Sequence, residues 1–266
     1  MRVGVGQFAS TTDKRANLVE ALDLVNTAAG QGAELVVLPE AAMFPFGGPA
    51  AEVEAAAEPL DGTYVSALAA AAAQHDVTIV AGMFEAVAGD DHVYNTVVAV
   101  GPGGLLGRYR KLHLFDALGW RESDVLRAGA LDADALLVLP VGELTIGVVT
   151  CYDLRFPEIF RALVDRGVNV LVVPAAWVAG PLKEEHWATL VAARAIENTC
   201  YLVAAAQAPP QFCGRSAILD PMGVLLAGLG EIAGVAVADL FLERVHEVRS
   251  KLPVLEHRRF GVRSGD

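Results

Sequence analysis

Three side chains of this sequence could together carry out acyl transfer. Glu40 ends a β-rich run, Lys111 stands in an alternating segment, and Cys151 directly follows the apolar run 144–150. A thiolate is a strong nucleophile, a nearby ammonium lowers the pKa of a thiol, and a carboxylate can accept the thiol proton. Because each of the three is attached to a strand or a strand end, we expect them to meet at one edge of a packed sheet.

Cys151 opens the segment 151–158, Cys-Tyr-Asp-Leu-Arg-Phe-Pro-Glu, between an expected strand and an expected helix. Such a turn points a short side chain away from the sheet edge, and the first N–H groups of a helix have no intrahelical acceptor. A nucleophile and an oxyanion site can therefore be built together there. The alternative is that Cys151 packs as a small buried hydrophobe, which is the usual place of a free cysteine.

Glu40 and Lys111 also have structural alternatives. A carboxylate at the start of a helix complements the helix dipole. Lys111 stands close to Arg108 and Arg110, as a surface lysine in a basic strand would. Each alternative is reasonable alone, but the chain order and shared setting of the three residues favour the catalytic interpretation.

The elements that position these residues alternate along the chain. Apolar β-branched runs and helical segments follow one another in both halves, which indicates an α/β fold. Turns also join the runs 94–100 to 105–111 and 136–139 to 144–149 as hairpins, so some neighbouring strands are antiparallel. Strands that are apolar throughout need cover on both faces, which predicts two mixed sheets with outer helices. We expect helices over residues 13–29, 62–75, 157–165, 186–198 and 240–251.

Composition excludes several classes of function. Hydrophobic residues make up 54% of the 266 residues, but the longest apolar stretch, 170–182, contains Pro174, Gly180 and Pro181 and is too short to span a bilayer. The N-terminus lacks the apolar core of a signal peptide, so we expect a cytoplasmic protein with no membrane partner. A formal net charge of −12 repels phosphate backbones, so no nucleic-acid partner is expected.

The sequence offers little else for a ligand site or a domain boundary. The three cysteines are widely spaced with no CxxC pair, and the six histidines include no HExxH arrangement, so we expect neither a metal nor a cofactor. Cys200 and Cys213 lack a setting like that of Cys151 and are interpreted as packing residues. No linker, charge block or repeat divides the chain, and we predict one domain over residues 1–266.

Taken together, these segments resemble the nitrilase superfamily of carbon–nitrogen hydrolases, whose catalytic set is Glu, Lys and Cys in that chain order. In detail the chain is similar to the Nit branch, whose members cleave small amides such as deaminated glutathione or ω-amido acids. Loop 207–214 departs from that branch because it looks shorter. The matching segments are Leu38-Pro-Glu40, Tyr109-Arg-Lys111, Cys151-Tyr-Asp-Leu-Arg155, 173–177, 186–187, 193–198, 214–216 and 220–223.

The resemblance implies a four-layer α-β-β-α sandwich with two mixed sheets, and pairing through helices next to the cysteine strand, so we expect a homodimer or a larger homo-oligomer. It also implies a second glutamate, Glu122, whose structural alternative is a solvated carboxylate beside Arg121. The backbone N–H of Tyr152, with Lys111, would stabilise an oxyanion. Trp177 would either wall the site or lie in the core.

The combined prediction is a thiol hydrolase that converts a small aliphatic amide, an ω-amide or a deaminated glutathione-like compound, to a carboxylate and ammonia. Cys151 attacks the amide carbon and forms a thioester. Glu40 takes the thiol proton, passes it to the leaving nitrogen, and then activates the hydrolytic water. A carboxylate on the acyl group could be recognised by an arginine that the sequence does not identify.

Other functions stay open at this point. A nitrilase or an N-carbamoyl amine hydrolase would use the same Glu-Lys-Cys set. A papain-like enzyme would use His186 as its base and would not need Lys111. A catalytically silent scaffold or binding protein would lack a member of the set, and this chain has all three. His113 is otherwise expected to be structural, and Arg155 and Glu158 are expected to form an ion pair.

Overall fold

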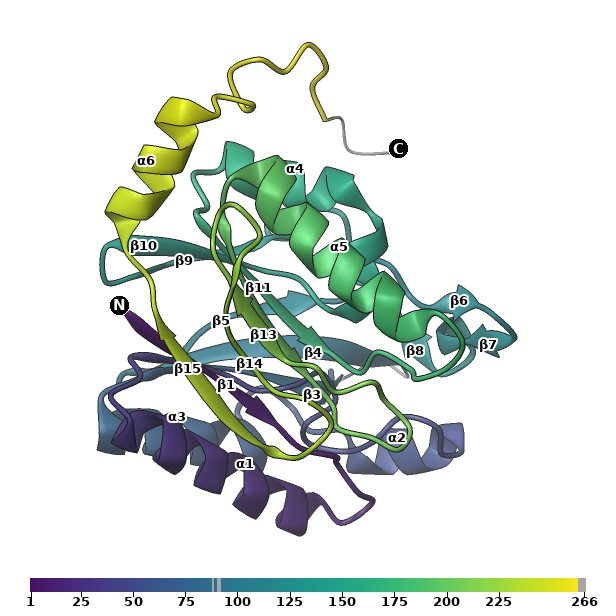
Figure 1. Cartoon of the computed structure of the whole chain (residues 1–266). Coiled ribbons are helices and arrows are strands. Elements are labelled where there is room, and N and C mark those ends of the chain that lie inside the picture. The colour runs from purple at the N-terminus through teal and green to yellow at the C-terminus, as the bar shows by residue number, and fades with distance from the viewer. Residues whose placement is uncertain (88, 90–91, 263–266) are drawn as a thin grey trace.

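Two mixed β-sheets form the centre of the computed structural model (Figure 1). The structure describes residues 1–87, 89 and 92–262. The first sheet contains β1 (Arg2–Gln7), β2 (Leu35–Val37), β3 (Thr78–Ala86), β4 (Val93–Gly101), β5 (Gly104–Arg110), β8 (Leu126–Arg127) and β15 (Gly234–Asp239). The second contains β9 (Leu137–Val141), β10 (Leu144–Val148), β11 (Val170–Ala175), β12 (Tyr201–Ala206), β13 (Ala217–Leu219) and β14 (Leu225–Gly228). A separate hairpin is formed by β6 (Asp116–Ala117) and β7 (Trp120–Arg121).

The strand order explains how distant parts of the sequence reach one place. The first sheet runs β15-β1-β2-β3-β4-β5, with β8 beside β4, and the second runs β14-β13-β12-β11-β10-β9. Strands β1, β2 and β3 are parallel to one another, and so are β10, β11 and β12. Parallel strands end at the same edge of a sheet, which is where ligand sites of open α/β sheets form. The segment after β2 in the first sheet meets the segments after β10 and β11 in the second, at the same end of the sandwich.

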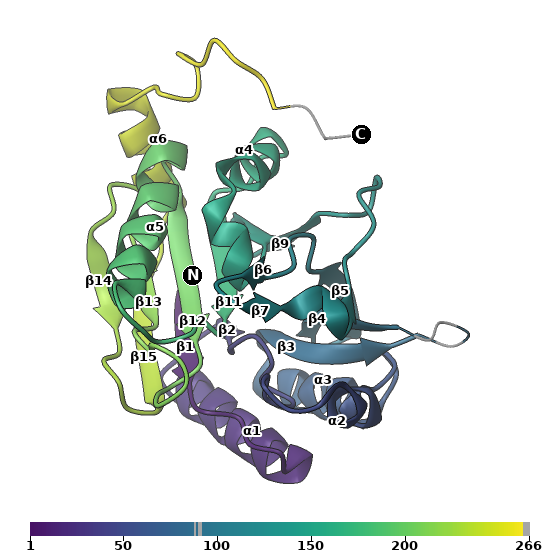
Figure 2. The ribbon, with the colours of Figure 1, turned by 90° about the vertical axis from the view of Figure 1, so that its right-hand side faces the viewer.

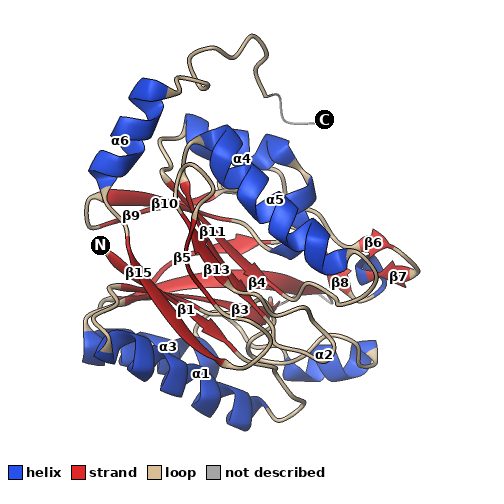
Figure 3. Cartoon of the chain, viewed as in Figure 1, coloured by secondary structure: helices blue, strands red, loops and turns tan. Residues whose placement is uncertain are grey.

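Helices cover the outer face of each sheet. These are α1 (Lys14–Gly30), α3 (Thr63–His75), α4 (Pro157–Asp165) and α5 (Lys183–Asn198), while α2 (Ala50–Ala56) contacts β3 and α6 (Leu242–Lys251) follows β15 and lies beyond the end of the sheets (Figure 1). Helices α1 and α3 lie against the first sheet, and α4 and α5 lie against the second (Figure 2). Figure 3 shows the strands inside and these helices outside. The predicted four-layer α-β-β-α sandwich is confirmed.

The position of strand β2 explains why its residues are all apolar rather than alternately apolar and polar. Leu35 and Val37 belong to the core between the sheets, whereas Val36 and Leu38 belong to the core under α1 and α3. Successive side chains of a strand point to opposite faces, so a strand covered on both sides needs an apolar residue at every position. The apolar run ends at Glu40, a buried carboxylate whose polar partners lie where the two sheets meet.

Helix α5 begins earlier than predicted, at Lys183 rather than His186. Its apolar periodicity begins only at the buried Trp187, so the pattern missed a first turn made of charged residues. Glu184 and Glu185 in that turn complement the helix dipole. The other predicted helices agree with the structure to within two residues at each end.

No helix in the described ranges combines the length and the apolar character needed to cross a bilayer. The single domain over residues 1–266, the cytoplasmic location and the homo-oligomeric state stay predictions.

Gly82 on β3 allows the chain that leaves β2 to pass very close. The Gly82 N–H donates to Pro39 O at 3.0 Å. A Cβ atom at this position would lie 2.5 Å from Ala41 N and 2.6 Å from Glu40 Cα. Both are backbone atoms, which cannot move aside as a side chain can, so only glycine lets Glu40 take its place.

We predict that Gly82→Ala lowers the free energy of unfolding by about 1–3 kcal/mol or more, because the added methyl group clashes with backbone. Urea denaturation measures this loss. Gly30→Ala is the matched control, since a Cβ at this last residue of α1 meets nothing within 4 Å. Equal stability of the two variants would show that the close approach at Gly82 does not constrain the fold.

Candidate active site

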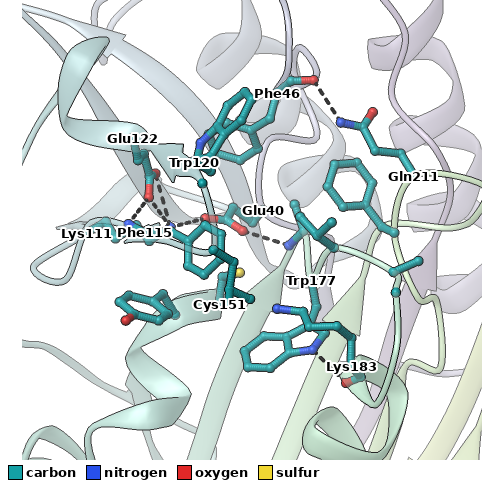
Figure 4. Close-up of a pocket in the computed structure, with 18 of the residues that line it drawn as sticks. Glu40, Phe46, Lys111, Phe115, Trp120, Glu122, Cys151, Trp177, Lys183 and Gln211 are labelled. Atoms are coloured by element: carbon teal, nitrogen blue, oxygen red, sulfur yellow. Dashed lines mark hydrogen bonds and ion pairs between the residues drawn. The ribbon is translucent and has the colours of Figure 1, made fainter.

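Glu40, Lys111, Glu122 and Cys151 lie together at the ends of the strands (Figure 4). Lys111 Nζ is 3.0 Å from Glu40 Oε1 and 2.8 Å from Glu122 Oε2. Glu40 is fully buried, and Lys111 and Glu122 are 2% and 3% exposed. Neither Lys111 nor Glu122 is a solvated surface charge, and the structure brings together all four residues that the sequence singled out.

Two carboxylates hold the ammonium of Lys111. Burial would lower the pKa of Lys111, but the charges of Glu122 and Glu40 outweigh burial and hold that pKa well above its usual range. Lys111 is therefore a permanent cation of the site. Glu122 also accepts a hydrogen bond from Phe115 N at 2.6 Å, which fixes its carboxylate beside the β6–β7 hairpin.

Asn95 on β4 is a site residue that the sequence analysis missed. Its Nδ2 donates to Glu40 Oε1 at 2.7 Å and to Glu122 Oε1 at 3.0 Å. An amide with two N–H donors can join two carboxylates without adding charge. The available signal was a polar residue inside the β-branched run 93–100.

Glu40 also ties the two sheets together. Its Oε2 accepts from Ala176 N, just after β11, at 2.7 Å. Its backbone oxygen accepts from Gln207 Nε2, just after β12, at 2.9 Å. Both carboxylate oxygens of Glu40 are thus committed, and the carboxylate is fixed in the space where the sheets meet.

Cys151 stands on a strained turn between β10 and a short 3₁₀ helix, Cys151–Arg155. Its φ of 46° lies in the left-handed region, which costs a non-glycine residue about 1–3 kcal/mol. Such a conformation persists only when neighbouring contacts enforce it. It aims the thiol out of the sheet edge toward the carboxylates, as the sequence analysis expected.

Asp153 supplies the contacts that hold this turn. Its Oδ2 accepts from Thr150 N at 2.9 Å and from Tyr109 Oη at 2.7 Å, and its Oδ1 is 2.7 Å from His113 Nδ1. Tyr109 lies two residues before Lys111, so one buried contact sets the cysteine turn relative to the lysine strand. His113 is structural, as predicted, and it stacks on Phe156 with ring centres 3.8 Å apart.

The thiol of Cys151 keeps its proton in this environment. Burial raises the pKa of Cys151, and Glu40 raises it further, both by its charge and by accepting a hydrogen bond from the thiol. Lys111 lowers that pKa, but not enough to offset the other effects, so it lies well above the usual range. The resting form of Cys151 is therefore the thiol, and the carboxylate of Glu40 is the neighbouring group able to accept its proton.

A pocket of about 550 Å³ gives access to these residues. A volume of this order suits a small organic ligand. Gln211 and Phe212 of loop 207–214 line it, and so do Leu118 and Trp120 of the β6–β7 hairpin. Its aromatic walls are Phe46, Phe115, Trp120, Tyr152, Trp177 and Phe212.

The other predicted site residues take clear positions. Tyr152 is the second residue of the 3₁₀ helix, so its N–H belongs to a first turn without intrahelical acceptors, and the residue lines the pocket. Trp177 both lines the pocket and is buried, with 2% exposed, so the two alternatives for it are compatible. Cys200 and Cys213 are buried packing residues.

One expectation is wrong, and one alternative loses support. In the described part of the chain, Arg155 forms no ion pair with Glu158, which is exposed; its guanidinium lies 4.9 Å from the centre of the Trp177 ring instead. His186 is not among the described residues that line the pocket, and its Nδ1 is 3.4 Å from an Arg155 nitrogen. The geometry therefore gives no support to a papain-like cysteine–histidine pair.

Comparisons with known proteins agree with this site. A family model described as carbon–nitrogen hydrolase matches residues 2–250. The chain is 39% identical over 260 residues to the deaminated glutathione amidase of Escherichia coli O157:H7, which covers 98% of each protein.

Solved structures of other proteins are also similar to this chain. The C. elegans NitFhit protein superposes with a TM-score of 0.87 at 30% identity, covering 97% of this chain and 65% of that chain. This chain thus spans about two thirds of NitFhit. An amidase from Nesterenkonia sp. AN1, crystallised as a glutamate-to-glutamine mutant with acrylamide added to its active-site cysteine, gives a TM-score of 0.76 at 27% identity, covering 95% of this chain and 98% of that chain.

We predict that Asn95→Ala lowers kcat/KM for a small amide about tenfold to a hundredfold, because hydrogen bonds to both carboxylates are lost. Steady-state kinetics measures the change. Thr96→Val is the control, since it removes a buried hydrogen bond of 2.8 Å to Glu85 from the adjacent position of β4. An equal loss of activity in both variants would mean that Asn95 acts through stability alone.

Removing the charge of Glu40 and removing the charge of Lys111 should shift the pKa of Cys151 in opposite directions. Glu40→Gln removes a negative charge and an acceptor, so the pH midpoint of iodoacetamide alkylation should fall, whereas Lys111→Met should raise it. Alkylation rates followed by intact mass against pH give both midpoints, with Cys151→Ala reporting any reaction of the other cysteines. A midpoint that rises in Glu40→Gln would contradict the assignment of Glu40 as the proton acceptor.

Proposed function

Because the chain belongs to the carbon–nitrogen hydrolase family, we propose that it hydrolyses a small amide through a thioester on Cys151. The observation that carries this proposal is the position of Lys111 Nζ between the carboxylates of Glu40 and Glu122, in a pocket that Cys151 also lines. Nucleophile, base and cation are thus assembled at one pocket before any substrate arrives.

In the first half-reaction, Glu40 takes the thiol proton while Cys151 Sγ bonds to the amide carbon. The carbonyl oxygen becomes an oxyanion. The Lys111 ammonium donates to Glu40 Oε1 at 3.0 Å and to both carboxylate oxygens of Glu122, at 3.1 and 2.8 Å, so it stabilises this oxyanion by its positive charge, together with the Tyr152 N–H. The C–N bond then breaks, Glu40 gives its proton to the leaving nitrogen, and the acyl group stays on sulfur.

The second half-reaction repeats these roles with water. Glu40 removes a proton from the water that attacks the thioester, and Lys111 and Tyr152 again stabilise the oxyanion. The C–S bond breaks, and the proton held by Glu40 returns to Cys151. One carboxylate is base and acid in turn, which requires that it lie beside both the thiol and the reacting nitrogen.

Glu122 has a positioning role in this proposal. It contacts the Lys111 ammonium and Phe115 N, so it fixes the cation and the adjoining pocket wall together. The amidase name of the Escherichia coli relative supports an amide of the deaminated glutathione or ω-amide type as the substrate. The pocket volume of about 550 Å³ is consistent with a compound of that size.

The test is ammonia or amine release from a panel of ω-amides, deaminated glutathione and simple nitriles, with intact mass recorded in parallel. We expect amide turnover and a thioester adduct on the wild-type protein. Cys151→Ala, Lys111→Met and Glu40→Gln should each lose about a thousandfold or more of the activity, because the three act as one unit. Each variant should remain folded by circular dichroism.

Two outcomes would overturn this proposal. Retained turnover in any of the three variants would break the mechanism. Turnover of nitriles with none of amides would assign the nitrilase reaction instead.

A further inference from the structure

Lys183 is a cation of the pocket that the proposed hydrolysis does not use. It is the first residue of α5, it lines the pocket, and it is 8% exposed. Its Nζ lies 4.6 Å from the centre of the Trp177 ring and 5.1 Å from the centre of the Phe115 ring. In Figure 4 its side chain crosses the indole of Trp177 on the side of Cys151.

No carboxylate of the described chain pairs with this ammonium. Lys111 has two carboxylate partners, whereas the contacts of Lys183 Nζ are the faces of the two aromatic rings. Aromatic faces attract a cation, but they replace its lost hydration poorly compared with an anion. A buried, unpaired ammonium that faces a ligand pocket is therefore poised for an anionic ligand.

The surroundings of Lys183 also favour an anion. Burial lowers the pKa of Lys183, and the nearby Arg155 lowers it further, whereas Cys151, Cys213 and Glu184 act in the opposite direction. A carboxylate placed on Nζ would reverse these unfavourable effects. Arg155 stands apart, because its guanidinium lies over Trp177 and it is not among the described residues that line the pocket.

An arginine was the residue expected to recognise an acidic acyl group. Among the described residues that line the pocket, there is no arginine, and the cations are Lys111 and Lys183. Lys111 is already neutralised by the carboxylates of the site. Of the two cations among the described pocket residues, Lys183 is thus the one without a carboxylate partner.

We propose that Lys183 binds a carboxylate on the acyl part of the substrate and so selects acidic amides over neutral ones. This inference rests on the proposed amide hydrolysis and names the substrate class. With the amide carbon at Cys151, the acyl chain lies along Trp177 and ends at Lys183 Nζ, where the carboxylate accepts charge-assisted hydrogen bonds. No covalent bond changes in this step.

The test compares matched substrates. The monoamides of succinic and glutaric acid have the same chain lengths as butanamide and pentanamide but add a carboxylate. We expect Lys183→Met to lower kcat/KM for the monoamides about tenfold to a hundredfold, mainly through KM, and to leave the neutral amides within about twofold. Arg155→Met is the matched control, because it removes the other cation on Trp177 and should leave the ratio of acidic to neutral amides unchanged.

A binding measurement separates this inference from the hydrolysis itself. Cys151→Ala should bind glutaric monoamide in calorimetry, and adding Lys183→Met should weaken that binding by a similar factor. Charge reversal by Lys183→Glu should move the preference toward 5-aminopentanamide, which carries an ammonium in place of the carboxylate.

The outcomes are distinguishable. If Lys183→Met lowers kcat/KM equally for acidic and neutral amides, Lys183 acts on Cys151 rather than on the substrate. That result would overturn this inference and leave the proposed hydrolysis standing. An unchanged ratio would overturn this inference as well. A wild-type protein that hydrolyses none of the amides would overturn the proposed hydrolysis. The calorimetry would then still test the role of Lys183, because equal binding of glutaric monoamide with and without Lys183→Met would contradict carboxylate binding by Lys183.

Discussion

The buried ammonium of Lys111 between Glu40 and Glu122 is the interaction on which the rest of the site depends. Removing charges from water is unfavourable unless each finds partners, so these three groups are stable only together. Their meeting requires two strands of the first sheet, the hairpin beside them and a second sheet that closes over Glu40. Gly82 permits the close backbone approach, and Asn95 joins the two carboxylates without adding a charge.

The same contacts decide the state of the nucleophile. Two carboxylates surround one ammonium, so the set carries an excess negative charge, and a thiolate at Cys151 would add another. Burial of the thiol and this negative charge both raise the pKa of Cys151, so the thiol is the resting form, and in the proposed mechanism Glu40 accepts its proton. Among the described residues, no carboxylate forms an ion pair with Lys183, so in the proposed recognition its charge is available for the far end of a substrate. The pocket thus separates the chemistry near Lys111 from recognition near Lys183.

The meeting of Glu40, Lys111 and Cys151 at strand ends was predictable from the sequence, but the expected single sheet edge was not found, because Cys151 follows a strand of the second sheet and the other two follow strands of the first. Glu122 came only from a family resemblance, since a carboxylate beside Arg121 looks solvated. Asn95 and Asp153 were missed because their roles depend on contacts between segments distant in sequence. Lys183 was missed for a local reason: a first turn of charged residues has no apolar periodicity, so the helix was expected to begin after it.

The ultraviolet absorbance of the thiolate tests the central claim, that burial and the negative charge of the site together keep Cys151 protonated. The difference spectrum between wild type and Cys151→Ala, titrated with pH, isolates this residue from Cys200 and Cys213. The account predicts no thiolate signal near neutral pH and a midpoint above the ordinary thiol pKa of about 8.5. A thiolate signal at neutral pH would contradict it, because a resting ion pair of Cys151 with Lys111 would leave no thiol proton for Glu40 to accept.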